Sequence, residues 1–255
     1  MNAGDIAARL DDELDVDAYA DLDASPNGLQ VGPAEQPVDH VAVAVDAAVE
    51  TVDRASDAGA DLLVTHHGVV WGSVERVTGT TYRRVAPLID DDLALYVAHL
   101  PLDGHQSLGN AAGLADLLDL TNRAPFGAMG PEHVGQRGTL PEPTTLSELT
   151  GTLASELDTG DGSVRTLDFG PSVVEDVAIV TGSGVDWLDE AAEAGADVLV
   201  TGEGKQQAYH EAREAGVNVV LAGHYATETF GVRSLQAELD DMGLETTYVD
   251  CPTGL

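Results

Sequence analysis

The sequence predicts an α/β protein of two duplicated lobes whose sheets are mostly parallel. Short, continuous apolar runs alternate with helical segments, which is typical of strands buried in a layered parallel sheet. In residues 59–68, apolar residues follow a helix end and stop at His66, His67 and a glycine. A similar stretch returns later in the chain without the two histidines. Open α/β sheets bind ligands at the carboxyl ends of their strands, so the paired histidines mark a candidate site.

The first part of the chain reads as a strand–helix–strand unit preceded by a turn. Residues 25–28, Ser-Pro-Asn-Gly, have the composition of a turn, and residues 29–32 lead out of it. The apolar periodicity predicts helices at 5–22, 46–59, 83–91 and 108–118, and strands at 41–45, 59–66 and 93–98.

Residues 125–143 are rich in glycine and proline and have no helical period, so they mark a lobe boundary or an excursion. We place the first lobe at residues 1–125 and 219–255 and the second lobe at residues 126–218. Beyond the boundary segment, the pattern predicts helices at 144–157, 187–195, 205–215 and 227–242, and strands at 164–169, 177–180, 197–200, 217–221 and 246–249.

An internal repeat relates the two lobes. Residues 57–65 (DAGADLLVT) return as residues 193–201 (EAGADVLVT), an offset of 136 residues, from 57 to 193. The same offset carries Val41 and Ala42 onto Val177 and Ala178. A single Ala-Gly-Ala-Asp turn could arise by chance, but agreement over a whole strand–helix–strand unit favours duplication.

The charge balance is strongly acidic, with 45 Asp and Glu against 11 Lys and Arg and a net charge of -34. Lys205 is the only lysine. Such a surface repels itself unless concentrated salt screens it, so we interpret it as adaptation to a salty, halophilic cytoplasm. It also argues against direct binding to nucleic acid, which needs a basic footprint.

The chain has one cysteine, Cys251, and no apolar run of the length of a membrane span. A lone cysteine fits a reducing compartment, and the acidic, amphipathic N-terminus is unlike a signal peptide. These features predict a cytoplasmic protein with no membrane contact.

Histidines and carboxylates recur at the predicted strand ends. His99 is followed four residues later by Asp103, and His224 is followed four residues later by Glu228. Each pattern alone is weak, because a solvated histidine near an acid is common in so acidic a chain. Together with the paired histidines, they place four imidazoles and two carboxylates at strand carboxyl ends, which lie along one rim of a parallel sheet.

Imidazole and carboxylate donors favour zinc, iron, manganese or nickel over calcium or magnesium. The donors outnumber the three protein ligands that one catalytic ion usually takes. The residues alone leave open one ion or two ions a few ångströms apart.

These motifs resemble those of the Nif-three-like family, whose members are often named GTP cyclohydrolase 1 type 2 homologs. The matching pieces, in the family's order, are PNGLQV at 26–31, THHG at 65–68, HLPLD at 99–103, TGE at 201–203 and GHYATE at 223–228. The chain resembles the short members of the family, which lack an inserted domain.

The resemblance implies a dinuclear divalent-metal site between the lobes and a toroidal homohexamer. The ligands that it implies are His66, His67, Asp103, His224 and Glu228, the last of them bridging the ions. His99 corresponds to a histidine beside the site, and His210 matches a family histidine on a helix after the TGE motif.

The resemblance also suggests a hydrolase in which a bridging hydroxide attacks a purine nucleotide or related heterocycle, at C8 of the guanine ring if the substrate is GTP. His99 and Glu203 are candidate proton shuttles. Lys205 and Arg233 are candidate phosphate contacts, although both also fit ordinary surface charges. The Gly182-Ser183-Gly184 turn is a weaker candidate for an anion site because it lacks the full dinucleotide fingerprint.

Three classes of function remain open on the sequence. The first is a metal-dependent hydrolase acting on a small molecule. The second is a non-catalytic protein that binds or delivers metal. The third is an interaction protein in which metal holds the fold.

Overall fold

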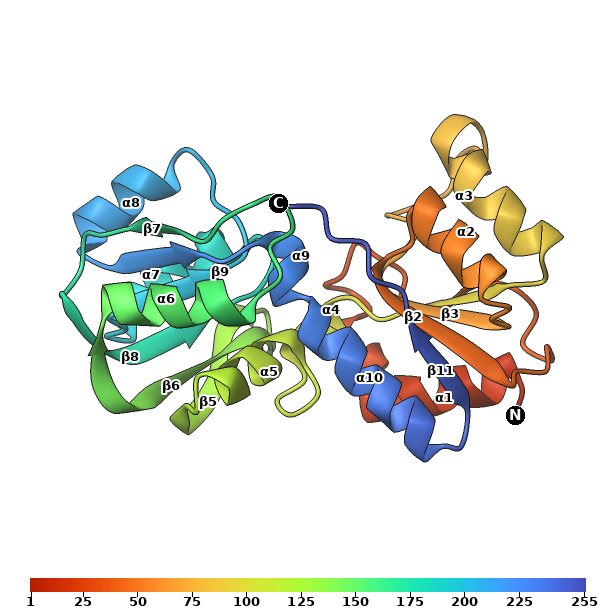
Figure 1. The fold of residues 1–255 in the computed structure, drawn as a ribbon, viewed down its shortest axis with the longest axis horizontal. Helices are drawn as coiled ribbons and strands as arrows, with labels where there is room; N and C mark the ends of the chain where they lie inside the picture. Colours follow the sequence, from red (N-terminus) through yellow and green to blue (C-terminus); the bar gives the residue numbers. More distant parts are fainter. The chain divides into compact units, whose positions relative to one another are not determined.

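The computed structural model describes residues 1–255, which form two compact units (Figure 1). The first unit comprises residues 1–102 and 231–251, and the second comprises residues 103–230 and 252–255. The α/β fold of two duplicated lobes predicted from the sequence is confirmed. None of the helices has the length and apolar character needed to cross a membrane.

The lobe boundaries of the structure differ from those that we placed at 125/126 and 218/219. The hairpin strands β5 (Thr121–Met129) and β6 (Glu132–Thr145) belong to the second sheet, so the glycine-rich segment lies inside a lobe. Strand β10 (Asn218–Leu221) pairs in parallel with β9 (Val198–Thr201), so it belongs to the second sheet and not to the first lobe. The second unit then continues to residue 230.

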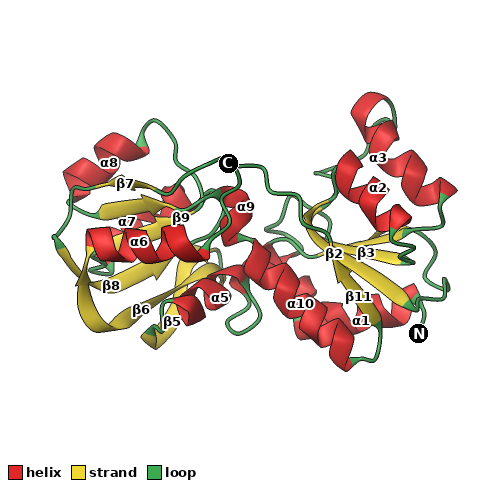
Figure 2. Ribbon diagram, viewed as in Figure 1, coloured by secondary structure: helices red, strands yellow, loops and turns green.

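The first unit has a five-stranded sheet in the order β1-β4-β3-β2-β11, parallel except at β1. Figure 2 shows its strands β2, β3 and β11 in yellow. Figure 1 shows α2 and α3 on one face and α1 and α10 on the other. Its elements are α1 (Ala3–Glu13), η1 (Val16–Tyr19), β1 (Gly28–Val31), β2 (His40–Asp46), α2 (Val49–Asp57), β3 (Leu62–His67), α3 (Gly79–Asp90), β4 (Ala94–Val97), α4 (Leu100–Gly104, crossing the unit boundary), most of α10 (Thr229–Asp241) and β11 (Glu245–Tyr248).

Successive strand residues alternate between two apolar layers in this unit, as the pleat requires. Ala42 and Ala44 of β2 and Leu63 of β3 pack with Val52 of α2 and Leu88 of α3 in one buried cluster. The alternate residues of the same strands are also buried, so both faces are covered. This burial explains why the strands read as continuous apolar runs.

The second unit has a six-stranded sheet in the order β5-β6-β8-β9-β10-β7, with parallel pairing only among β8, β9 and β10. Helices α5 and α6 pack on one face of it in a single apolar cluster. Its elements are α5 (Asn110–Leu117), β5, β6, α6 (Leu146–Glu156), β7 (Arg165–Leu167), β8 (Val173–Ile179), η2 (Gly184–Trp187), α7 (Leu188–Glu193), β9, α8 (Ala208–Ala215), β10 and α9 (His224–Thr227).

The internal repeat extends to side-chain hydrogen bonds. Asp61 Oδ2 accepts from the amides of Asp39 at 2.9 Å and His40 at 3.0 Å. At the repeat-related position, Asp197 Oδ2 accepts from the amides of residues 175 and 176 at 2.8 and 3.0 Å. Each aspartate thus ties the start of its own strand to the preceding strand of the same sheet.

We expect Asp61→Ala and Asp197→Ala each to lower the free energy of unfolding by about 1–3 kcal/mol, because each leaves two strand amides without their charged acceptor. Urea unfolding in molar salt measures the loss. The matched controls are Asp57→Ala and Glu193→Ala, which are repeat-related and exposed, and which should stay within about 0.5 kcal/mol of the parent. Equal losses in both pairs would contradict this role for the aspartates.

Candidate metal centre

Three imidazole rings gather at the carboxyl ends of β3 and β4 in the first unit. The ring centroids of His66 and His67 lie 4.5 Å apart, and that of His99 lies 5.1 Å from His66 and 5.6 Å from His67. One ring nitrogen of each lies within 4.8 Å of the corresponding atoms of the other two. His66 is fully buried, and the other two are partly exposed. The cluster therefore has the donors and the spacing to hold a metal ion.

An acceptor holds the Nδ1 atom of each ring. The pairs are His66 with the carbonyl of Ala98 at 2.9 Å, His67 with Asp46 Oδ1 at 2.9 Å, and His99 with Asp23 Oδ1 at 2.8 Å. A carbonyl oxygen only accepts, so Nδ1 of His66 carries the proton and its neutral ring has the lone pair on Nε2. This is the arrangement of metal-binding histidines, in which an outer partner fixes the tautomer and the ring orientation.

The turn that contains the PNGLQV motif fixes His99. Asn27 Oδ1 accepts from the amide of His99 at 2.7 Å, and Asn27 Nδ2 donates to Asp23 Oδ2 at 2.9 Å. Burial alone would raise the pKa of Asp23, but hydrogen bonds and charge from His99, with donors from Asn27 and Ser25, outweigh it and lower that pKa. Asp23 therefore stays ionised behind the imidazole.

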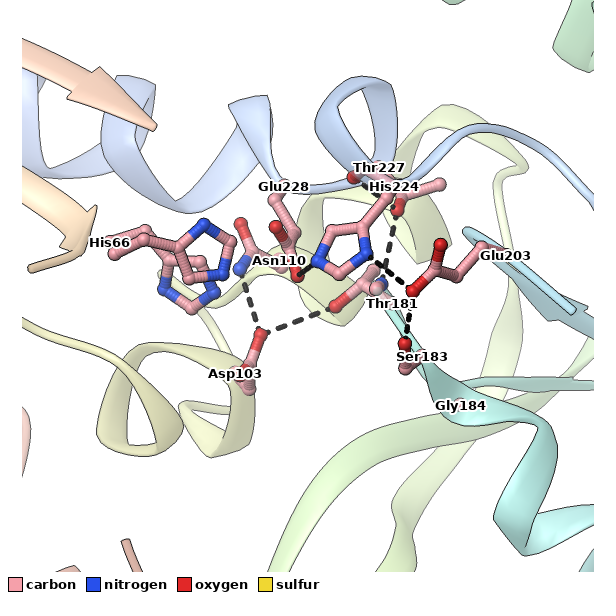
Figure 3. A network of polar contacts seen from close by, with 12 residues as sticks. His66, Asp103, Asn110, Thr181, Ser183, Gly184, Glu203, His224, Thr227 and Glu228 are labelled. Carbon is pink, nitrogen blue, oxygen red and sulfur yellow. Dashed lines mark hydrogen bonds and ion pairs between the residues drawn. The ribbon is translucent and has the colours of Figure 1, made fainter. Parts of the chain in front are cut away.

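The second unit carries its own donors, beginning with Asp103 (Figure 3). Asp103 is 8 % exposed, and its Oδ1 accepts from Asn110 Nδ2 at 2.9 Å and Thr181 Oγ1 at 3.3 Å. Asn110 and Thr181 are buried as well. Because both donors meet the same oxygen, the carboxylate plane of Asp103 is fixed.

His224 lies between two carboxylates at the end of β10 (Figure 3). Its Nε2 lies 3.2 Å from Oε1 of the buried Glu228, one helical turn away, and its Nδ1 lies 3.2 Å from Oε1 of Glu203. Burial opposes the charged imidazolium, but the hydrogen bonds and charges of Glu228 and Glu203 outweigh it and raise the pKa of His224 to about 9. Metal binding at Nε2 would displace that proton.

Glu203 supports His224 from the Nδ1 side. The Ser183 hydroxyl donates to Glu203 Oε1, and this bond, helped by His224 and opposed by partial burial, lowers the pKa of Glu203. Its carboxylate therefore takes the place that Asp46 and Asp23 take behind the histidines of the first unit. The predicted role of Glu203 in proton transfer stays a prediction.

A comparison with known protein families identifies the family of this chain. The model for "Duf34/NIF3 (NGG1p interacting factor 3)" matches residues 1–253. The chain belongs to the Duf34/NIF3 family. A relative from Halobacterium salinarum named "GTP cyclohydrolase 1 type 2 homolog" is 57% identical over 255 residues, covering 100% of both chains.

Solved structures of NIF3-like chains share the whole fold. The structure titled "Structural genomics, protein ybgI, unknown function" has a TM-score of 0.90 at 34% identity, with 100% of both chains covered. Protein TTHA1606 from Thermus thermophilus has a TM-score of 0.88 at 36% identity, again with 100% of both chains covered. The NIF3 fold of this chain is thus shown along its full length.

The cations predicted to contact phosphate have partners within this NIF3 chain. Lys205 forms an exposed ion pair with Asp186, and the guanidinium of Arg233 lies 3.8 Å over the ring of Tyr248 in the first unit. The ammonium group of Lys205 would have to break its ion pair with Asp186 to bind a phosphate. The phosphate-binding role of Lys205 and Arg233 stays a prediction. His210 lies exposed on α8.

The Gly182-Ser183-Gly184 turn uses its donors internally. The amide of Gly182 donates to Thr227 Oγ1 at 3.3 Å, and the amide of Gly184 donates to Thr201 Oγ1 at 2.8 Å. Two of its amides are therefore committed to threonine hydroxyls, which argues against an anion site there. The turn instead fits closely around His224 and Glu228.

Gly182 is required for that close fit. It has a φ of +58°, and a Cβ there would lie 2.3 Å from Glu228 Oε1 and 3.1 Å from His224 Nε2. We expect Gly182→Ala to lower stability by more than the roughly 1–2 kcal/mol of backbone strain and to weaken Zn²⁺ binding, because Glu228 must move. Urea unfolding and Zn²⁺ titration measure the two effects.

Gly195→Ala is the matched control. Gly195 also has a positive φ, +77°, but no atom lies within 4 Å of a Cβ built there. This variant should show the backbone strain alone and bind Zn²⁺ like the parent. Equal behaviour of the two variants would show that Glu228 moves aside without cost.

Proposed function

We propose that this protein binds divalent metal ions through His66, His67, Asp103, His224 and Glu228 and uses them in hydrolysis of a purine nucleotide or related heterocycle. The observation that supports metal binding most is that His66, His67, His99 and His224 all face an acceptor with Nδ1. One buried histidine with such a bond is an ordinary core residue. Four at strand ends match the outer-shell pattern of metal sites.

The donors also fit the class of metal. Imidazole nitrogens with carboxylates suit iron, zinc, manganese or nickel, and five ligands exceed the three that a single catalytic ion usually takes. We therefore propose two ions, with donors from both units and with Glu228 as the bridging carboxylate. The toroidal homohexamer stays a prediction from the family resemblance.

Bound divalent cations would supply hydroxide near neutral pH and polarise the bond under attack. The protein's own groups prepare this chemistry. Asn110 and Thr181 hold Asp103 in one orientation, and Asp46 and Glu203 hold the rings of His67 and His224. His99, hydrogen-bonded to Asp23, and Glu203 are the candidates for proton transfer.

The name of the Halobacterium salinarum relative suggests GTP as the first substrate to test. Hydrolysis at C8 would open the guanine imidazole ring with one water and release C8 as formate with a second. Lys205 and Arg233 are proposed to contact the triphosphate. A protein that binds metal but turns over no nucleotide or heterocycle would instead fit metal storage or delivery.

We expect His66→Ala and Glu228→Ala each to weaken Zn²⁺ or Mn²⁺ binding by more than about 100-fold, beyond the 10- to 100-fold effect of losing an outer-shell partner. Calorimetric titration of chelator-treated protein in molar salt measures it. The exposed His210→Asn is the control and should bind like the parent.

The double variant His66→Ala/Glu228→Ala tests whether the units share their ions. If they do, the two losses are strongly non-additive, because the first substitution already disrupts the common site. Strictly additive losses, or separate binding steps each removed by one variant, would contradict a shared site.

Metal-loaded protein should release formate from GTP in molar salt, and chelator should abolish the release. Glu228→Ala should lower the rate by more than about 100-fold through loss of a metal ligand. Formate is measured with a coupled dehydrogenase, and His210→Asn is again the control. If fully metal-loaded protein releases no formate from GTP and hydrolyses no other purine or heterocycle, the catalytic proposal fails while metal binding stands.

We expect Asn110→Leu to weaken metal binding by about 10- to 100-fold, because Asp103 loses the nearer of its two donors and turns more freely. Asn110→Ser, which keeps a short donor, should bind metal more tightly than the leucine variant. Calorimetry measures affinity, and circular dichroism checks the fold. Metal affinity equal to the parent in both variants would show that Asn110 does not position Asp103.

A further inference from the structure

Trp71 is a large aromatic residue that lies half exposed beside the first-unit imidazoles. Its side chain is 48% exposed. The ring lies 5.0 Å from that of His99 at an interplanar angle of 82° and 6.0 Å from that of His67 at 42°. An indole placed mainly to stabilise the core would be more deeply buried, whereas this one lies exposed in contact with two imidazoles of the candidate site.

Hydrogen bonds pin the loop on both sides of Trp71. The amides of Val69 and Val70 donate to Gln30 Oε1 at 3.1 and 3.3 Å, and Gln30 Nε2 donates to the carbonyl of Pro26 at 2.7 Å. On the other side, the amide of Gly72 donates to the carbonyl of Ala24 at 2.6 Å. The turn at residues 23–31 thus anchors both the Trp71 loop and His99.

Gly68 is part of the same anchor. A Cβ at this position would lie 2.5 Å from Gln30 Oε1, so the glycine allows the Gln30 amide to reach the loop. The backbone on both sides of the exposed indole is therefore fixed by hydrogen bonds before any ligand binds. Such preorganisation lowers the entropy cost of binding a ligand.

We propose that Trp71 is the stacking platform for the planar heteroaromatic ring of the ligand that binds at His66, His67 and His99. This inference rests on the proposed function, which it deepens by naming the feature of the substrate that the protein recognises. An exposed indole offers its π face to any flat ring, and the adjacent imidazoles place a bound ion near that ring. In a protein of net charge -34, stacking also supplies attraction to a nucleotide that surface charge does not.

Trp71 can be observed alone, since the chain has only two tryptophans. The other, Trp187, lies in the second unit and donates from Nε1 to the carbonyl of Ala128 at 3.1 Å. The variant Trp187→Phe leaves Trp71 as the sole indole fluorophore. The probes are GTP and ATP, which carry a ring, and inorganic tripolyphosphate, which does not.

We expect GTP or ATP to quench the Trp71 emission of Zn²⁺-loaded protein in a saturable way and tripolyphosphate to leave it unchanged. With the full chain, Trp71→Ala should raise the calorimetric Kd of the quenching nucleotide by about 5- to 100-fold, the effect of losing one base–aromatic stack. Trp71→Phe should recover most of the affinity. Zn²⁺ content should stay at the parent level in both variants.

Four results would overturn the inference: no quenching by either nucleotide, equal quenching by tripolyphosphate, an unchanged nucleotide Kd in Trp71→Ala, or an emission shift that depends only on protein concentration. The last would indicate that a second copy covers the indole. Metal content is measured independently of fluorescence, so a failure of the proposed metal site can be told apart from a failure of the stacking role of Trp71. Stacking without metal binding would refute the proposed metal site and keep the role of Trp71 in ring binding. Metal binding without stacking would keep the proposed metal site and refute this inference.

Discussion

The hydrogen bond from Nδ1 of each strand-end histidine to a fixed acceptor is the constraint on which the candidate site depends. For His66 the acceptor is the carbonyl of Ala98. The amide of Ala98 in turn donates to the carbonyl of Thr65, in the neighbouring strand, at 2.9 Å. For His67 it is Asp46, which pairs with it across β2 and β3. Parallel register therefore determines which acceptor each imidazole meets, and with it which nitrogen carries the lone pair.

The duplication produced two copies of one scaffold with different chemistry at the strand ends. Gly202 and Glu203 occupy the positions related by the repeat to His66 and His67. A Cβ at Gly202 would lie 2.7 Å from the Cα of His224, so the start of α9 leaves no room for a side chain there. The second copy thus supplies its imidazole from the next strand end, and Glu203 holds that imidazole in place.

Local patterns in the sequence were enough to predict the buried parallel strands, the repeat and the histidines at the strand ends. A buried strand and its end are recognisable from a few contiguous residues, so no distant contact has to be known. The β5–β6 hairpin was not predicted: Gly127 and Gly130 look like loop residues, yet they allow tight turns and close strand packing with φ of +77° and +63°. Partners distant in sequence were also missed. Asp23 meets His99 across 76 residues and Thr181 meets Asp103 across 78 residues, so no local spacing marks either pair.

A chain of net charge -34 attracts cations everywhere on its surface, and this alone selects none of them. Exposed carboxylates are screened by the salt that such a surface needs, and each keeps its hydration water. Selectivity has to come from donors that are buried and fixed before an ion arrives. The side chains of His66 at 0%, Glu228 at 3% and Asp103 at 8% exposure are buried in this way, and an imidazole nitrogen among the proposed ligands would disfavour the hard ions that carboxylates alone would accept. In the metal site that we propose, selectivity among cations would therefore come from burial and from the imidazole nitrogens, and the acidic surface would add little to it.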